Sequence, residues 1–171
     1  TDAVAVRFAP RVWLNDTSSF TDTNVEMVVS VNNSMGLTST GLSMTFMYED
    51  SVLEPIEVVP CGVTEGVKFA STPGLTGSAG RLACSVSATG GEIKTGAGLF
   101  FKIKFRVKPV NGVASTTVIL TAATLRTGAG RTVVPPLPQR GVITLAERAY
   151  PPALVTVAVA DKVVDSESEF E

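Results

Sequence analysis

Strict alternation of apolar and polar residues predicts a long β-strand near the middle of the chain. Between Gly98 and Pro109, apolar residues at odd positions alternate with mostly basic residues at even positions. A period of two over ten residues places one set on each face of a strand, whereas a helix would scatter both sets. We therefore expect one face to lie on a core and the basic face to be solvated, which discourages aggregation. The expected core set is Leu99, Phe101, Ile103, Phe105 and Val107.

Eight further segments show the same period or a short β-prone run. Glycine- and proline-rich turns separate them, and no amphipathic helix pattern occurs. Nine short strands with such turns predict an all-β fold, a nine-stranded β-sandwich with jelly-roll topology. We expect this sandwich to comprise residues 1–148. The eight segments are residues 4–8, 25–31, 42–48, 56–59, 67–71, 81–89, 116–125 and 142–145.

Residues 149–171 are predicted to be a C-terminal extension or linker. The apolar run Leu154–Val164 is consistent with an extra edge strand or with the start of a linker, and the acidic residues after it predict a solvated tail. Its carboxylates lack the spacing of an EF-hand loop, so we expect no metal site there. Because the chain starts abruptly at Thr1 and ends in DSESEFE, we expect a module of a longer protein.

Composition restricts the chemistry of the chain. The 171 residues include 14 basic and 16 acidic ones, a net charge of −2, so no basic field attracts nucleic acid or an anionic membrane. No apolar run approaches the roughly 20 residues that cross a bilayer. The chain has no histidine, which excludes Ser-His-Asp and Cys-His catalysis and imidazole metal sites. Glu49, Asp50, Glu54 and Glu57 surround a turn that implies no cleft, so we expect neither an enzyme nor a cofactor.

The two cysteines leave two alternatives open. Cys61 and Cys84 could form one disulfide, or each could be buried as a separate thiol. The sequence alone favours neither.

Two longer runs resemble the signature segments of the cohesin family. GLSMTFMYEDSVLEPIEV, at residues 41–58, resembles the cohesin strand that ends in an aromatic residue before an acidic pair and a Val-Leu-Glu turn. GRLACSVSATGG followed by GAGLFFKIKFRVKP, within residues 80–109, resembles the Gly-initiated strand, Gly-rich bend and long alternating strand of the same family. The resemblance covers about residues 4–145 in the same order. It implies a nine-stranded jelly roll that binds a dockerin, a small calcium-loaded helical module, through one sheet face.

The resemblance also assigns the binding residues. The face would be built from residues 42–48, 67–71, 81–89 and the end of 116–126. The best-studied cohesins have Asn and Asp where this chain has Gly41 and Ser43, so we expect its cognate dockerin to differ from the usual cellulosomal type. Small side chains on a flat sheet would let a helix lie close, burying on the order of 800 Å² per partner. The implied partner-binding set is Gly41, Ser43, Thr45, Met47, Ala70, Cys84, Val86, Thr89 and Arg126.

Two placements within this set stay open. On the strand at residues 81–89, the resemblance points Cys84 and Val86 outward and Ala83, Ser85 and Ser87 inward, whereas the amphipathic pattern gives the reverse. Met47 suits either an adaptable exposed contact or a buried position under a loop.

Two other classes of function fit a sandwich of this composition. A carbohydrate-binding module usually presents a row of exposed aromatic residues. This chain has only Trp13, Tyr48 and Tyr150 besides its phenylalanines, and Tyr48 falls on the expected core face. A structural repeat of a surface adhesin is the other alternative, since fold alone does not fix function. We expect a monomeric recognition module located outside the cell or on its surface.

Overall fold

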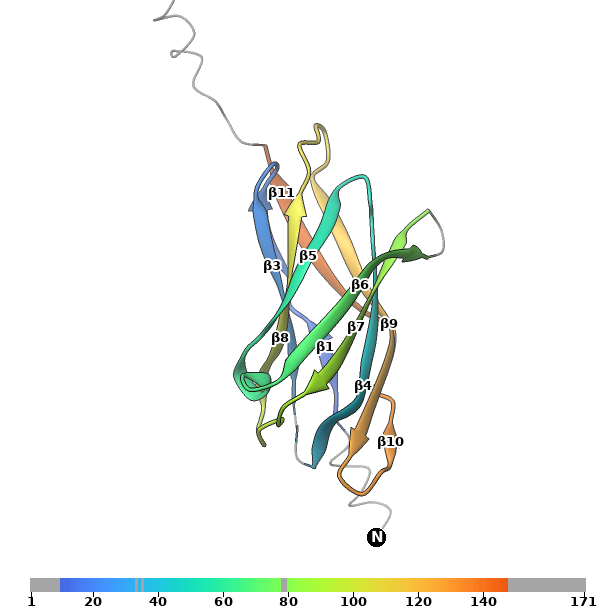
Figure 1. The fold of residues 1–171 in the computed structure, drawn as a ribbon. Coiled ribbons are helices and arrows are strands. Elements are labelled where there is room, and N and C mark those ends of the chain that lie inside the picture. The colour runs from blue at the N-terminus through green and yellow to red at the C-terminus, as the bar shows by residue number, and fades with distance from the viewer. Residues whose placement is uncertain (1–9, 33, 35, 78–79, 148–171) are drawn as a thin grey trace, which may run out of the picture.

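Two β-sheets pack face to face in the computed structural model, which describes residues 10–32, 34, 36–77 and 80–147 (Figure 1). The smaller sheet has four strands in the order β1-β3-β8-β5, all antiparallel. The larger sheet has the order β2-β11-β9-β4-β7-β6, and β10 adds to β9. In it only β2 and β11 pair in parallel. This arrangement confirms the predicted all-β sandwich.

Eleven strands and one 3₁₀ turn lie within the described residues, more than the nine strands expected. The additional strands β1, β2 and β10 are only two to four residues long. The expected strand at residues 4–8 and the C-terminal segment 149–171 lie outside the described residues. In chain order the elements are β1 (Val12–Leu14), β2 (Thr17–Phe20), β3 (Asn24–Val31), β4 (Leu37–Tyr48), β5 (Leu53–Pro60), η1 (Gly62–Thr64), β6 (Lys68–Thr76), β7 (Leu82–Gly90), β8 (Gly98–Val107), β9 (Ser115–Thr127), β10 (Thr132–Val133) and β11 (Gln139–Ala146).

The core between the sheets is centred on β8 and β4. Phe101 of β8 packs edge-on to Phe46 of β4, with ring centroids 6.0 Å apart, and stacks on Phe69 at 5.1 Å. Phe105 contacts Tyr48 across the sandwich, with ring centroids 6.0 Å apart and ring planes tilted by 53°. Aromatic rings bury more apolar surface than any other side chain, so these pairs contribute strongly to the stability of the two-layer arrangement.

The first residues of β8 depart from the predicted alternation. Leu99 is 42% exposed, whereas Phe100 and Phe101 are both fully buried. The pairing of β3 with β8 shifts between Val29 and Ser30, which inserts Phe100 as an extra residue. Such a bulge reverses the faces on one side of it, so the expectation that Leu99 lies in the core was wrong. The other four predicted core residues of this strand are buried.

The basic face of β8 is balanced by carboxylates. Its three cations and Lys108, which follows the strand, each pair with an acidic residue of β3, β5 or a nearby turn, at N–O distances of 2.6 to 3.6 Å. All these side chains are 30–56% exposed, which agrees with the predicted solvated surface. The pairs are Lys102–Glu26, Lys104–Glu57, Arg106–Asp22 and Lys108–Asp50.

Both cysteines are free thiols, which settles the two alternatives left by the sequence. Cys84 is fully buried in the core, and this burial raises the pKa of its thiol from 9.0 to about 11. Cys61 is half-buried at the end of β5, where desolvation also raises its thiol pKa. No helix in the described part of the chain has the length and hydropathy to cross a bilayer.

Candidate functional site

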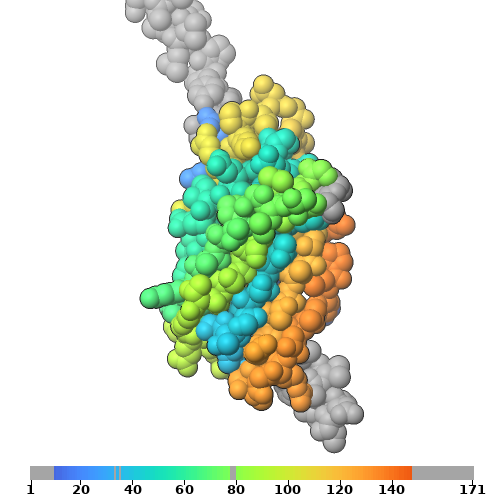
Figure 2. Space-filling view, turned by 45° about the vertical axis from the view of Figure 1, so that its right-hand side comes forward, coloured from blue at the N-terminus to red at the C-terminus, as the bar shows by residue number. Residues whose placement is uncertain are grey.

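The outward side of the larger sheet presents four long strands side by side. Figure 2 shows β6, β7, β4 and β9 as adjacent diagonal stripes from green to orange, with no described loop lying across them. Their register aligns outward-pointing residues into rows that cross all four strands. We call the surface formed by the three central rows the outer face.

Two of the three rows consist mainly of small hydroxyl side chains. The first row contains Ala70, Ser87, Ser43 and Thr124. The second contains Thr72, Ser85, Thr45 and Ala122. Their side chains are exposed or half-buried and short, so a partner can approach the sheet backbone closely. We call them the hydroxyl rows.

The third row is apolar and lies at the end of the outer face where β4 finishes. It contains Leu75, Ala83, Met47 and Ile119. Leu75 is 40% exposed, while Ala83 and Ile119 lie low in the sheet at 5% and 8%. Met47 is half-buried between them, so it is neither fully exposed nor fully buried. We call this set the apolar row.

The outward placement of Cys84 and Val86 was wrong. Both side chains are fully buried, and they pair with the core residues Phe46 and Met44 of β4. Ser85 and Ser87 point outward instead, as the amphipathic pattern of this strand had indicated. Because paired residues of antiparallel strands share a face, the core side chains of β4 fix which face of β7 is buried. Cys84 and Val86 therefore cannot touch a partner on the outer face.

The other sequence-predicted site residues lie on or beside the outer face. Ser43 and Thr45 occupy its centre, Met47 lies in the apolar row at one end, and Ala70 lies on the edge strand β6. Thr89 is exposed at the rim, where its hydroxyl donates a hydrogen bond of 3.2 Å to the carbonyl oxygen of Lys68. Gly41 and Arg126 come together beyond the first hydroxyl row.

Gly41 and Arg126 form one structural feature. Gly41 lies in a bulge of β4, between residues Thr38 and Ser43, and has a φ of +78°. A Cβ atom at this position would lie 3.1 Å from Nε of Arg126. The absence of a side chain on Gly41 therefore lets the Arg126 side chain lie across β4 at this end of the outer face.

A second arginine lies at the opposite end. Arg140 of β11 pairs with Ile119, which extends the apolar row by one exposed cation. Arg81 lies nearby, and its Nη1 atom donates a hydrogen bond of 2.8 Å to the carbonyl oxygen of Thr117. Local sequence carried no signal for Arg140, because it does not show which strand becomes the neighbour of β9.

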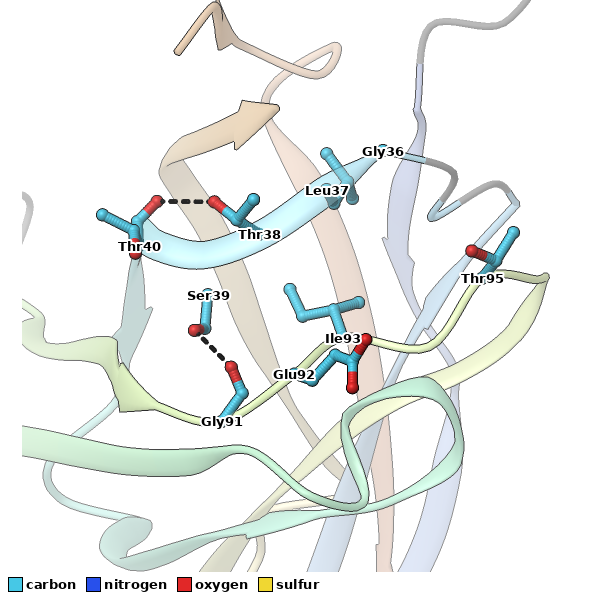
Figure 3. Close-up of a pocket in the computed structure, with 9 residues that line it drawn as sticks. All are labelled: Gly36, Leu37, Thr38, Ser39, Thr40, Gly91, Glu92, Ile93 and Thr95. Atoms are coloured by element: carbon cyan, nitrogen blue, oxygen red, sulfur yellow. Dashed lines mark hydrogen bonds between the residues drawn. The ribbon is translucent and has the colours of Figure 1, made fainter. Parts of the chain in front are cut away.

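A shallow pocket adjoins the Gly41 end of the outer face. Figure 3 shows it between the start of β4 and the loop after β7. Its volume is about 460 Å³. The Ser39 hydroxyl donates a 2.7 Å hydrogen bond to the carbonyl oxygen of Gly91, and this bond holds the two walls together. Glu92 is the one titratable residue in the lining, so the pocket offers no acid–base pair. Among the described residues, no group of three or more His, Cys, Asp or Glu could hold a metal ion.

The outer face therefore provides contact surface rather than catalytic groups. Its centre carries short side chains that let a partner lie close to the sheet, and an apolar row and peripheral arginines surround this centre. Such a composition is typical of a protein-binding patch.

Comparison with known proteins identifies the same architecture. A family model described as "Cohesin domain" matches residues 11–136. No curated protein matches the sequence. The structure resembles a non-cellulosomal cohesin of the archaeon Archaeoglobus fulgidus, with 16% identity, 86% of this chain and 97% of that chain covered, and a TM-score of 0.57.

Two structures of cohesin–dockerin complexes also match. The complex Coh-OlpA-Doc918 from Clostridium thermocellum matches with a TM-score of 0.61 and 13% identity, covering 81% of this chain and 99% of that chain. The sixth cohesin of scaffoldin B from Acetivibrio cellulolyticus, in complex with a mutant Cel5 dockerin, matches with a TM-score of 0.60 and 16% identity, over 81% and 99%. At these identities the likeness establishes a shared fold.

Proposed function

The chain belongs to the cohesin family, and from this premise we propose that it is a recognition module that binds a dockerin through its outer face. The observation that carries the proposal is the alignment of the hydroxyl rows across β6, β7, β4 and β9. A helix of the partner can lie against such a surface, with dispersion and apolar burial supplying affinity. The chain itself would do no chemistry and would need no cofactor, whereas its dockerin partner would be calcium-loaded.

This function implies a role in attachment. Several of the matched structures hold a cohesin together with a dockerin, and another is a non-cellulosomal cohesin. We infer that this module attaches a dockerin-bearing protein to a scaffold or cell surface outside the cell. Because the Archaeoglobus fulgidus cohesin is non-cellulosomal, we do not restrict the proposed scaffold to a cellulosome.

The carbohydrate-binding alternative has less support in the structure. Sugar rings stack on rows of exposed aromatic side chains. Tyr48 is only 2% exposed, and the aromatic residues that are well exposed in the described part of the chain are Trp13 and Phe20. These two lie on β1 and β2, in different sheets, so they form no continuous row.

The proposal is tested by placing a long cation in the centre of the outer face. Ser43→Arg and Thr45→Arg should each abolish binding of calcium-loaded dockerins, because the new side chain holds the partner helix away from the sheet. Thr144→Arg is the matched control, since Thr144 is an exposed residue of β11 in the same sheet but outside the four strands. Binding is measured by calorimetry and folding by circular dichroism. Unchanged affinity of both central variants would refute the assignment of the site.

A further inference from the structure

The distribution of ion pairs differs sharply between the two sheets. On the smaller sheet, all four cations of the basic surface beside β8 have carboxylate partners. On the outer face of the larger sheet, neither Arg126 nor Arg140 has an ion-pair partner among the residues that the structure describes. Both arginines are exposed. Their guanidinium groups are therefore available to a partner rather than used within the fold.

The two arginines mark opposite ends of the outer face. Arg126 of β9 pairs with Thr38, beyond the first hydroxyl row, and Arg140 pairs with Ile119 in the apolar row. Arg126 and Ile119 are seven positions apart on β9, and at about 3.3 Å per residue this corresponds to about 23 Å, slightly less because β9 has a bulge here. A helix rising about 1.5 Å per residue covers such a span in about 15 residues, or four turns.

Acidic groups near these ends are few. Glu92 lines the pocket that adjoins the Gly41 end. At the other end, Glu49 accepts a hydrogen bond from the hydroxyl of Thr116, a buried residue of β9. The three rows of the outer face contain no acidic residue. The charge that a partner meets on the outer face and at its two ends is thus set mainly by arginine.

We propose that the outer face selects a dockerin helix with a carboxylate near each end of its contacting stripe, small residues in the middle and an aliphatic side chain over the apolar row. The inference rests on the proposed function and specifies its partner. Arginine binds carboxylates through paired hydrogen bonds, so Arg126 and Arg140 would hold the two ends of the helix. Leu75 and Met47 supply apolar contact at one end only, which fixes the direction of the helix on the sheet.

A display experiment identifies the preferred helix directly, whichever protein carries the cognate dockerin. The probe is a library built on the calcium-loaded Cel5 dockerin of Acetivibrio cellulolyticus, with the exposed helix positions randomised, and it is selected against the whole chain. We expect binders enriched in Asp or Glu at two positions about four turns apart. Binders that depend on Ser43 but carry no such acidic pair, or carry basic residues there, would overturn this inference while leaving the proposed function intact. Binders insensitive to Ser43→Arg, or no binders at all, would overturn both.

Charge variants then assign the contacts to individual arginines. For a selected binder, Arg126→Gln and Arg140→Gln should each weaken binding about tenfold, as expected for the loss of one close charge pair at an interface. Arg11→Gln is the matched control, because Arg11 is an exposed arginine just before β1 in the other sheet, and it should leave affinity unchanged. Glu92→Gln should leave binding unchanged or strengthen it. Equal losses from the Arg11 and Arg126 variants would show only a general charge effect and overturn the assignment.

Salt dependence provides an independent readout. Raising the ionic strength from about 0.05 M to about 0.5 M should weaken the wild-type complex more than the complex of the Arg126→Gln/Arg140→Gln double variant, because exposed ion pairs are screened over this range. An identical salt response of the two proteins would contradict a role for the two guanidinium groups.

Discussion

Replacing Gly41 with alanine tests how the backbone of β4 shapes the outer face. The φ of +78° lies in the left-handed region, which costs a residue with a Cβ atom about 1 kcal/mol or somewhat more. The new Cβ would also lie 3.1 Å from Nε of Arg126 and displace that side chain from β4. We therefore expect Gly41→Ala to lower the free energy of unfolding by about 1–2 kcal/mol, or the Tm by about 3–6 °C for a domain of this size.

Two further glycines separate the backbone cost from the contact with Arg126. Gly36 has nearly the same φ, +77°, but a Cβ there meets nothing within 4 Å, so Gly36→Ala should show the backbone cost alone. Gly66 has neither a positive φ nor a close neighbour, and Gly66→Ala should be neutral or slightly stabilising.

Binding provides the second measurement for this variant. Gly41→Ala should reduce dockerin affinity because it moves Arg126, whereas Gly36→Ala should not. Combining Gly41→Ala with Arg126→Ala should add no further loss of binding beyond Arg126→Ala alone. Chemical denaturation and calorimetry of these variants supply both quantities. A Gly41→Ala protein as stable as the Gly66→Ala protein would refute the account of this bulge.

The remaining predictions concern the core. Phe101→Ala should lower the unfolding free energy by about 3–5 kcal/mol in urea denaturation, because Phe101 is fully buried and packs against three aromatic rings; a loss below about 1 kcal/mol would contradict its central position. Cys84 should react with a thiol reagent only after unfolding, while Cys61 reacts in the folded protein. Burial raises the pKa of the Cys84 thiol to about 11 in the folded state, so folding favours the neutral thiol. The contribution of the neutral thiol to stability is complete below about pH 9, and it is lost as the pH rises towards 11. Wild-type stability should fall more steeply than that of Cys84→Ala across this range, and parallel curves would refute the argument.

The alternating pattern of the sequence predicted the layers of the fold because a buried face imposes a period of two. It failed at Leu99, since a bulge is an insertion into the pairing of two strands and leaves no mark on the composition of either one. On β7 the pattern was right and the position-by-position carry-over was wrong. Cys84 pairs with the core residue Phe46, and this pairing determines that Cys84 lies on the buried face of β7. An alignment between distant relatives can be shifted by one residue, and such a shift exchanges the two faces of a strand.

The candidate site was partly predictable for the same reason. The cohesin resemblance assigned Ser43, Thr45 and Ala70 to one sheet face, and the strand register places all three on the outer face. Arg140 and Leu75 could not be found in this way. Each reaches the apolar row only through its pairing with a neighbouring strand, a long-range relation that local sequence does not contain.

The alternation of β4 also explains how partner preference can change without loss of the fold. Thr45 and Phe46 are adjacent in sequence, yet Thr45 lies on the outer face while Phe46 is fully buried against Phe101. The free energy of folding depends mainly on the buried set, and half-exposed hydroxyl residues contribute little to it. A half-buried residue of the outer face such as Ser43 can therefore differ, and alter what the sheet presents to a partner, while the core beneath keeps its packing. The same separation requires that Thr45→Arg remove binding and leave the unfolding free energy within about 0.5 kcal/mol of the wild type.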